Sequence, residues 1–119
     1  MRVFILDDEP TMLDIIAINF QLSGWEAETS TYDYDPPSGF DAYLIDVGLP
    51  RESGIDIARR LITRSPDSTV ILFSAYDRDH IETWGGGEFL FISKMTSVQS
   101  IPELVEMCVN HERELRGAR

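Results

Sequence analysis

Side chains that can do chemistry follow four short apolar segments of the sequence. They are Asp7, Asp8 and Glu9 after the first segment, Asp46 after the second, Ser74 after the third and Lys94 after the fourth. Carboxylates gathered at one place repel one another and ionise together only beside a counter-charge. Mg²⁺ prefers oxygen ligands and typically takes one or two carboxylates, whereas Zn²⁺ favours His and Cys, which these positions lack. If the segments converge, the residue types favour a magnesium site with a hydroxyl and an ammonium group beside it.

The elements that must position these residues are predicted as alternating strands and helices. Continuous runs of Val, Ile, Leu and Phe are typical of parallel strands that are buried on both faces. We predict strands over residues 3–6, 43–45, 70–73 and 89–92, a weaker strand over 26–30, and helices over 11–22, 55–62 and from 101 onward. This alternation predicts a doubly wound α/β sheet with right-handed crossovers. Ligand sites of such sheets lie beyond the carboxyl ends of the strands, which is where the side chains stand.

Composition narrows the class of protein. The 119 residues suffice for one domain, which we place over 1–119. The formal net charge of −11 argues against nucleic acid or an anionic membrane as the main partner. The single cysteine, Cys108, cannot form an intrachain disulfide and suits a reducing compartment. The apolar run at the start of the chain has only four residues, which is too few for a signal peptide or a membrane span. We therefore expect a cytoplasmic protein.

The ordered set of residues resembles the receiver domains of bacterial two-component response regulators, over nearly the whole chain. The matching positions are the Asp7-Asp8 pair, Asp46, Pro50 and Gly54 in the segment that follows it, Ser74-Ala75, and Lys94. The resemblance implies a flavodoxin-like, five-stranded parallel sheet of order 2-1-3-4-5.

The resemblance also implies a role for each matching residue. Asp46 would take a phosphoryl group from a phosphohistidine of a sensor kinase or phosphotransfer protein. The implied Mg²⁺ ligands are Asp7, Asp8, Asp46 and the backbone carbonyl of Gly48. Lys94 would pair with the carboxylate and then with a phosphoryl oxygen, and the Ser74 hydroxyl would bond another. The protein would modify itself rather than turn over a substrate, and so would not be an enzyme in the usual sense.

The family's readout and partners carry over as further expectations. The aromatic position that responds to the hydroxyl residue is Phe91 here, which has no hydroxyl of its own. We expect the output to be a downstream protein or an output domain after residue 119, and no kinase module before Met1.

The sequence departs from the family pattern in three places. Residues 31–39 include Pro36 and Pro37 and cannot sustain the family's second helix, so we expect Tyr32 and Tyr34 to cover the sheet there. The fourth helix has room only between residues 77 and 84, before a triple glycine at 85–87 that we interpret as a flexible connector. This shortening predicts a monomer before phosphorylation. Met95 replaces a family proline, so we expect a trans Lys94–Met95 bond.

Two other activities that occur on a related sheet fit these residues less well. A phosphatase of the haloacid dehalogenase type would need acids one residue apart after the first strand, and here they are adjacent. A flavodoxin-like flavin carrier would need a phosphate-binding loop where this chain has three acids. The serious alternative is a degenerate receiver that acts as an interaction module without being phosphorylated.

Overall fold

The computed structural model describes residues 1–117, and its strands form one parallel sheet. The strands are β1 (Arg2–Leu6), β2 (Glu26–Ser30), β3 (Ala42–Asp46), β4 (Thr69–Ser74) and β5 (Leu90–Ser93). Their order is β2-β1-β3-β4-β5, and every pairing is parallel. This confirms the predicted fold class. The last strand lies one residue later than predicted, because Phe89 belongs to the turn that closes on Gly86.

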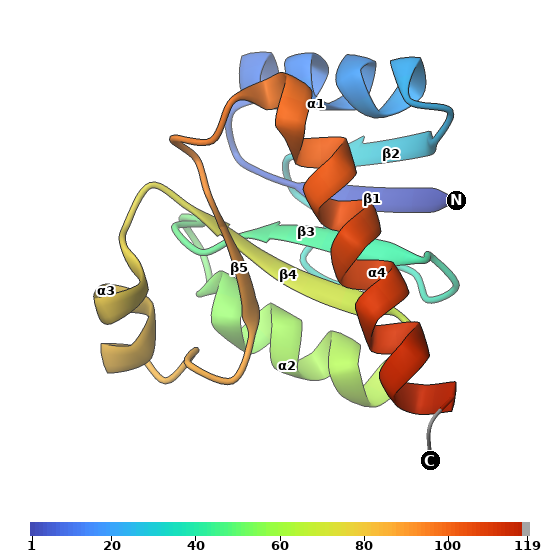
Figure 1. The fold of residues 1–119 in the computed structure, drawn as a ribbon. Helices are drawn as coiled ribbons and strands as arrows, with labels where there is room; N and C mark the ends of the chain where they lie inside the picture. The colour runs from blue at the N-terminus through green and yellow to red at the C-terminus, as the bar shows by residue number, and fades with distance from the viewer. Residues whose placement is uncertain (118–119) are drawn as a thin grey trace.

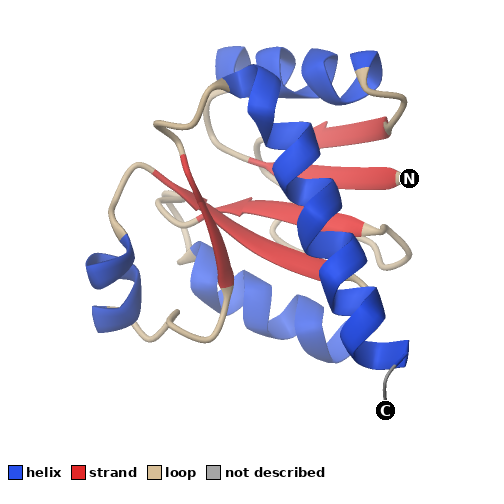
Figure 2. Cartoon of the chain, in the orientation of Figure 1, coloured by secondary structure: helices blue, strands red, loops and turns tan. Residues whose placement is uncertain are grey.

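Helices cover both faces of the sheet. They are α1 (Pro10–Leu22), α2 (Gly54–Arg64), α3 (Arg78–Thr83) and α4 (Ile101–Gly117), the last preceded by the 3-10 turn η1 (Val98–Ser100). Figure 1 shows α1 and α4 on one face and α2 on the other, and Figure 2 shows the strands between these layers. Among residues 1–117, no helix is both long and apolar enough to cross a bilayer.

Two apolar cores hold the layers together. Side chains alternate between the two faces of a strand, so neighbouring residues of one strand enter different cores. Leu44 and Ile71 pack with α1 and α4, whereas Ile45 and Leu72 pack with α2. All residues of β3 and β4 are buried. The strand ends are therefore fixed points from which polar side chains can be presented.

The end of α1 is set by Gly24, the predicted C-terminal cap. Gly24 has a φ of 88°, and its N–H donates to the Gln21 carbonyl over 3.0 Å. The next N–H, of Trp25, donates to the Phe20 carbonyl over 3.0 Å, and the two rings meet edge to face at 5.1 Å. This is the Schellman arrangement with its apolar contact, and it turns the chain into β2.

The connection between β2 and β3, residues 31–41, contains no helix, as predicted. The Tyr43 hydroxyl donates to the Pro37 carbonyl over 2.6 Å, and Tyr34 packs against the α2-side core. Tyr32 is 79% exposed, so the prediction that it covers the sheet is wrong. The reason is local: the Ser30 Oγ accepts the N–H groups of Tyr32 and Asp33, and the resulting turn leaves Tyr32 outside the packed layer.

The helix α3 corresponds to the fourth helix of the family, because the second one is absent here. It is only six residues long, which confirms the predicted shortening. The glycines after it are not a loose connector, however. The Gly86 N–H donates to the Ile81 carbonyl over 2.8 Å, and a Cβ at Gly86 would lie 2.9 Å from the Ile81 side chain. Glycine is needed at this position because α3 packs directly on the backbone. The peptide bonds of the described residues are all trans, including Lys94–Met95.

Candidate functional site

The sheet brings the predicted residues to one edge. Asp7 follows β1, Asp46 ends β3, Ser74 ends β4 and Lys94 follows β5. Backbone hydrogen bonds continue the ladder past the strand ends: the Lys94 N–H donates to the Ser74 carbonyl over 2.8 Å, and the Val47 N–H to the Phe73 carbonyl over 3.1 Å. Because the strands are parallel neighbours, their carboxyl ends meet, and the side chains of Asp7, Asp8, Asp46 and Lys94 converge as predicted.

Three carboxylates form the centre of the site. Asp7 and Asp46 are buried and Asp8 is exposed, and one carboxylate oxygen from each lies within 4.8 Å of the others. Backbone amides orient the two buried groups. The Glu9 N–H donates to Asp7 Oδ1, and the Gly48 N–H donates to Asp46 Oδ1, each over 3.0 Å.

Lys94 contacts both buried acids. Its Nζ lies 2.7 Å from Asp7 Oδ2 and 3.3 Å from Asp46 Oδ1. The expected pairing with Asp46 is therefore present, but Asp7 is the nearer partner. The sequence held no signal for this, because it depends on how the side chain bends over the sheet edge, where its Nζ lies 5.4 Å from the Phe73 ring centre.

The electrostatics of the site follow from burial and crowding. Burial, together with the charge of Asp7, raises the pKa of Asp46 to about 6, although Lys94 and the Gly48 N–H act in the opposite direction. Burial acts to lower the pKa of Lys94, but the two carboxylates outweigh it and raise that pKa. One ammonium group thus faces three carboxylates, and the site is short of positive charge.

The residues present fit Mg²⁺. The cluster offers oxygen donors alone, which is the ligand type that Mg²⁺ prefers. Asp7 Oδ2 is buried and accepts no aligned hydrogen bond, and within residues 1–117 its one ion pair is with the Lys94 ammonium. A divalent cation beside Asp7, Asp8 and Asp46 would supply the missing charge.

Ser74 is buried and faces its own loop. Its Oγ accepts the Tyr76 N–H over 2.9 Å. A hydroxyl has one donor hydrogen and two lone pairs, so this contact leaves the O–H able to donate to an oxygen at the site.

Gly54 explains how the loop after Asp46 is held. A Cβ there would overlap the Asp46 carbonyl, so only glycine lets α2 begin this close to the strand end. The Gly54 N–H donates to the Val47 carbonyl over 3.1 Å, and the Ser53 Oγ caps the helix by accepting the Ile55 N–H. The resulting loop directs the Gly48 amide at Asp46.

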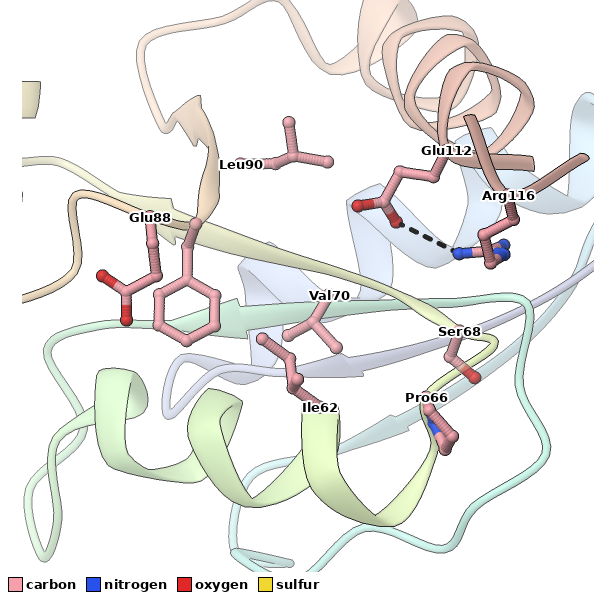
Figure 3. Close-up of a pocket in the computed structure, with 9 residues that line it drawn as sticks. Ile62, Pro66, Ser68, Val70, Glu88, Leu90, Glu112 and Arg116 are labelled. Atoms are coloured by element: carbon pink, nitrogen blue, oxygen red, sulfur yellow. Dashed lines mark ion pairs between the residues drawn. The ribbon is translucent and has the colours of Figure 1, made fainter. Parts of the chain in front are cut away.

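Two hollows lie at opposite ends of the sheet. A groove of about 620 Å³ opens next to Gly48, between the loop 47–53 and the rings of Tyr76 and Trp84. A hollow of about 230 Å³ lies at the amino ends of β4 and β5, lined by Val70, Leu90 and the Glu112–Arg116 ion pair (Figure 3). The first is lined by Val47 and Gly48, next to Asp46, and a third hollow of about 350 Å³ is lined by Asp8 itself.

Comparison with known proteins gives one consistent result. The family model described as "Response regulator receiver domain" matches residues 3–106. A relative, the probable transcriptional regulatory protein TcrX of Mycobacterium tuberculosis, is 27% identical over 111 residues, which are 85% of this chain and 46% of TcrX. The chain thus spans less than half the length of the curated relatives it matches.

Solved structures share the fold. A receiver domain protein (CheY-like) from Methanospirillum hungatei matches with a TM-score of 0.80 and 18% identity, covering 95% of this chain and 96% of that one. The response regulator TrrA from Thermotoga maritima, in complex with Mg²⁺ and BeF, matches with a TM-score of 0.71 and 22% identity, covering 90% and 97%.

Proposed function

Because the chain belongs to the response regulator receiver domain family, we propose that Asp46 accepts a phosphoryl group in a Mg²⁺-dependent reaction. The donor is a phosphohistidine of a sensor histidine kinase or phosphotransfer protein. The P–N bond of the donor breaks and an O–P bond to an Asp46 carboxylate oxygen forms. The single observation that carries this proposal is the convergence of Asp7, Asp8, Asp46 and Lys94 at one sheet edge.

Each residue has a separate task in this proposal. Asp46 is oriented for attack by the Gly48 N–H. Asp7, Asp8, Asp46 and the Gly48 carbonyl would hold the cation, which would neutralise charge on phosphoryl oxygens. The Lys94 ammonium moves from a carboxylate to a phosphoryl oxygen, and the Ser74 O–H donates to another. Positioning and charge neutralisation supply most of the catalysis in phosphoryl transfer. In this proposal the chain modifies its own Asp46 and does not turn over a separate substrate.

The deciding experiment is incubation with acetyl phosphate and Mg²⁺, followed by intact mass spectrometry. We expect a mass gain of one phosphoryl group in the wild type, none in Asp46→Asn and none after chelation of the metal. The control is Asp41→Asn, an acid paired with Arg113 away from the site, which should be modified normally. Modification of Asp46→Asn at the wild-type rate would refute the assignment, and an unmodified wild type would favour a phosphorylation-independent interaction module.

Lys94 is tested separately. Lys94→Ala should still bind Mg²⁺ in a calorimetric titration, because the carboxylates remain, but should respond weakly to phosphorylation. If Lys94→Ala shows the wild-type conformational response to phosphorylation, Lys94 has no part in the mechanism.

Partners and assembly follow from family membership and from α3. We propose that the output is a downstream protein or an attached output domain, as the names of the relatives as transcriptional regulators suggest. The thiol of Cys108 is free, which suits the cytoplasm. With α3 shortened, we expect a monomer before phosphorylation. Light scattering that shows a tight dimer would contradict this.

A further inference from the structure

Most basic residues of this acidic chain contact a carboxylate. These are Arg2, Arg59, Arg60, Arg64, Lys94, Arg113 and Arg116. Within residues 1–117 the exceptions are Arg51 and Arg78, which have no carboxylate oxygen within 4.0 Å. Neither of the two acids beside Arg78 in sequence pairs with it; Asp77 instead caps α3 and contacts His80. Arg78 instead places its guanidinium carbon 5.5 Å from the centre of the Phe91 ring.

Phe91 shares a face of the sheet with Ser74. In the β4–β5 register, Leu72 stands opposite Phe91 and Ser74 opposite Ser93. Residues two apart in a strand point to the same side, so Ser74 and Phe91 are diagonal neighbours on the α2 face. Phe91 is partly buried there against the α2-side core. A guanidinium over its outer side limits how far the ring can turn.

One short segment joins Ser74 to Arg78. The Ser74 Oγ accepts the Tyr76 N–H, Asp77 caps α3, and Arg78 is the first residue of that helix. A displacement of Ser74 toward a phosphoryl group on Asp46 therefore pulls on the same backbone that carries Arg78. It also opens space on the face where the Phe91 ring lies.

We propose that Arg78 is a positioning residue for the phosphoryl site: its guanidinium holds the Phe91 ring in place and so favours the unphosphorylated arrangement of Ser74. The inference rests on the proposed function and adds to it a regulatory contact particular to this chain. Phe91 has no hydroxyl and cannot make a side-chain hydrogen bond. The cation–π contact with Arg78 is therefore the polar interaction that holds the ring. Breaking the contact shifts the equilibrium toward the phosphorylated arrangement without touching the reacting atoms.

The test is a titration with beryllofluoride, an aspartyl phosphate analogue, at fixed Mg²⁺, followed by NMR of ¹³C-labelled Phe rings. We expect Arg78→Met, which keeps the length and removes the charge, to bind beryllofluoride about two- to fivefold more tightly, the size of an exposed cation–π contact. Arg78→Lys should restore wild-type affinity because it restores a cation. Arg2→Met, which removes the guanidinium that lies 4.3 Å from the Phe40 ring centre at the start of β1, the far end of the sheet, is the matched control and should not change the affinity.

A second comparison shows whether the effect passes through the ring. In a Phe91→Leu background, Arg78→Met should have no further effect. The inference is overturned if Arg78→Met binds like the wild type, if Arg78→Lys behaves like Arg78→Met, if Arg2→Met gives the same gain, or if the gain persists without the ring. A wild type that never binds beryllofluoride would refute the proposed function instead. In that case the ligand-free proteins decide on the contact between Arg78 and Phe91. Phe91 signals of Arg78→Met that coincide with those of the wild type would refute the contact, and shifted signals would support it.

Discussion

The β2–β3 connection, residues 31–41, and the β4–β5 connection, residues 75–89, are both short but are fastened differently. The first has no helix, and two arginines of α2 hold its backbone: Arg60 donates to the Tyr34 carbonyl over 2.9 Å and Arg64 donates to the Pro36 carbonyl. The second keeps α3, whose only buried side chain is Ile81, and Arg59 of α2 donates to the Gly85 carbonyl after it.

The surfaces of the two connections differ as well. In the first, Pro36 and Phe40 are buried. In the second, Tyr76 is 50% exposed and Trp84 is 45% exposed, and their rings meet edge to face at 4.9 Å in solvent. The second connection follows Ser74, a residue of the site, and its first six residues, 75–80, are all exposed, whereas Ile81 and Phe89 further along are buried. Residues 75–80 can therefore move with the hydroxyl, whereas α2 holds the first connection at Tyr34 and Pro36 and the second one only further along, at Gly85.

The largest expected effect tests the anchor of α3. Ile81 is fully buried, so Ile81→Ala should cost about 2–4 kcal/mol through lost burial and the cavity left behind. The amides of α3 should exchange with solvent faster than those of β4, because the helix loses its one anchor. Ile62→Ala on α2 is the control, since Ile62 is 45% exposed. A loss of under about 0.5 kcal/mol in urea unfolding of Ile81→Ala, the range of ordinary surface changes, would show that α3 is held by other contacts.

Removing the arginine clamp should have a smaller effect. The double variant Arg60→Met, Arg64→Met loses charged hydrogen bonds to two carbonyls, which are partly exposed, and should cost about 1–2 kcal/mol in urea unfolding. Hydrogen exchange should rise in residues 31–41. Arg59→Met, which releases the second connection, should leave exchange in 31–41 unchanged. Equal exchange changes in both connections would erase the distinction drawn between them.

Asp41 closes the first connection and gives it a dependence on pH. Burial acts to raise the pKa of Asp41, but the Arg2 N–H and the Arg113 guanidinium outweigh it and hold that pKa below its usual value. A lowered pKa means that the contact stabilises the fold above the unfolded-state pKa and is lost as pH falls through the folded-state value. Asp41→Asn should therefore be less stable than the wild type at pH 7, and the difference should vanish in strong acid. A gap independent of pH in urea unfolding would contradict this.

The sheet and its reactive edge could be predicted because they depend on local patterns. Apolar runs identify buried strands, and the topology then places the residue after each run. These patterns placed Asp46 and Ser74 at the ends of strands, whereas the strand order and the roles of the two residues followed from the family resemblance. The pairing of Lys94 with Asp7 could not be predicted, because a long side chain chooses among carboxylates only once the strand ends are placed. The contact of Arg78 with Phe91 is of the same kind, since it joins two segments through side chains alone.

The two tyrosines of the first connection show the same limit. Both Tyr32 and Tyr34 are amphipathic, and nothing in the composition separates them. Tyr34 packs on the core, and its hydroxyl accepts the Arg51 N–H over 3.4 Å, whereas Tyr32 is turned outward by the Ser30 hydrogen bonds. The orientation of each tyrosine side chain depends on a turn between two strands. The apolar periodicity that identifies helices and strands carries no information about such a turn.

The smallest expected effect uses this pair. Tyr32→Ala should change the free energy of unfolding by no more than about 0.5 kcal/mol, because a side chain that is 79% exposed loses little burial on truncation. Tyr34→Ala should cost more, because it removes a packed ring and leaves the Arg51 N–H without its partner. Urea unfolding of both variants measures the difference within one short segment of the same chain. Equal costs would mean that Tyr32 does pack on the sheet in solution, and the first connection would then be fastened along its whole length.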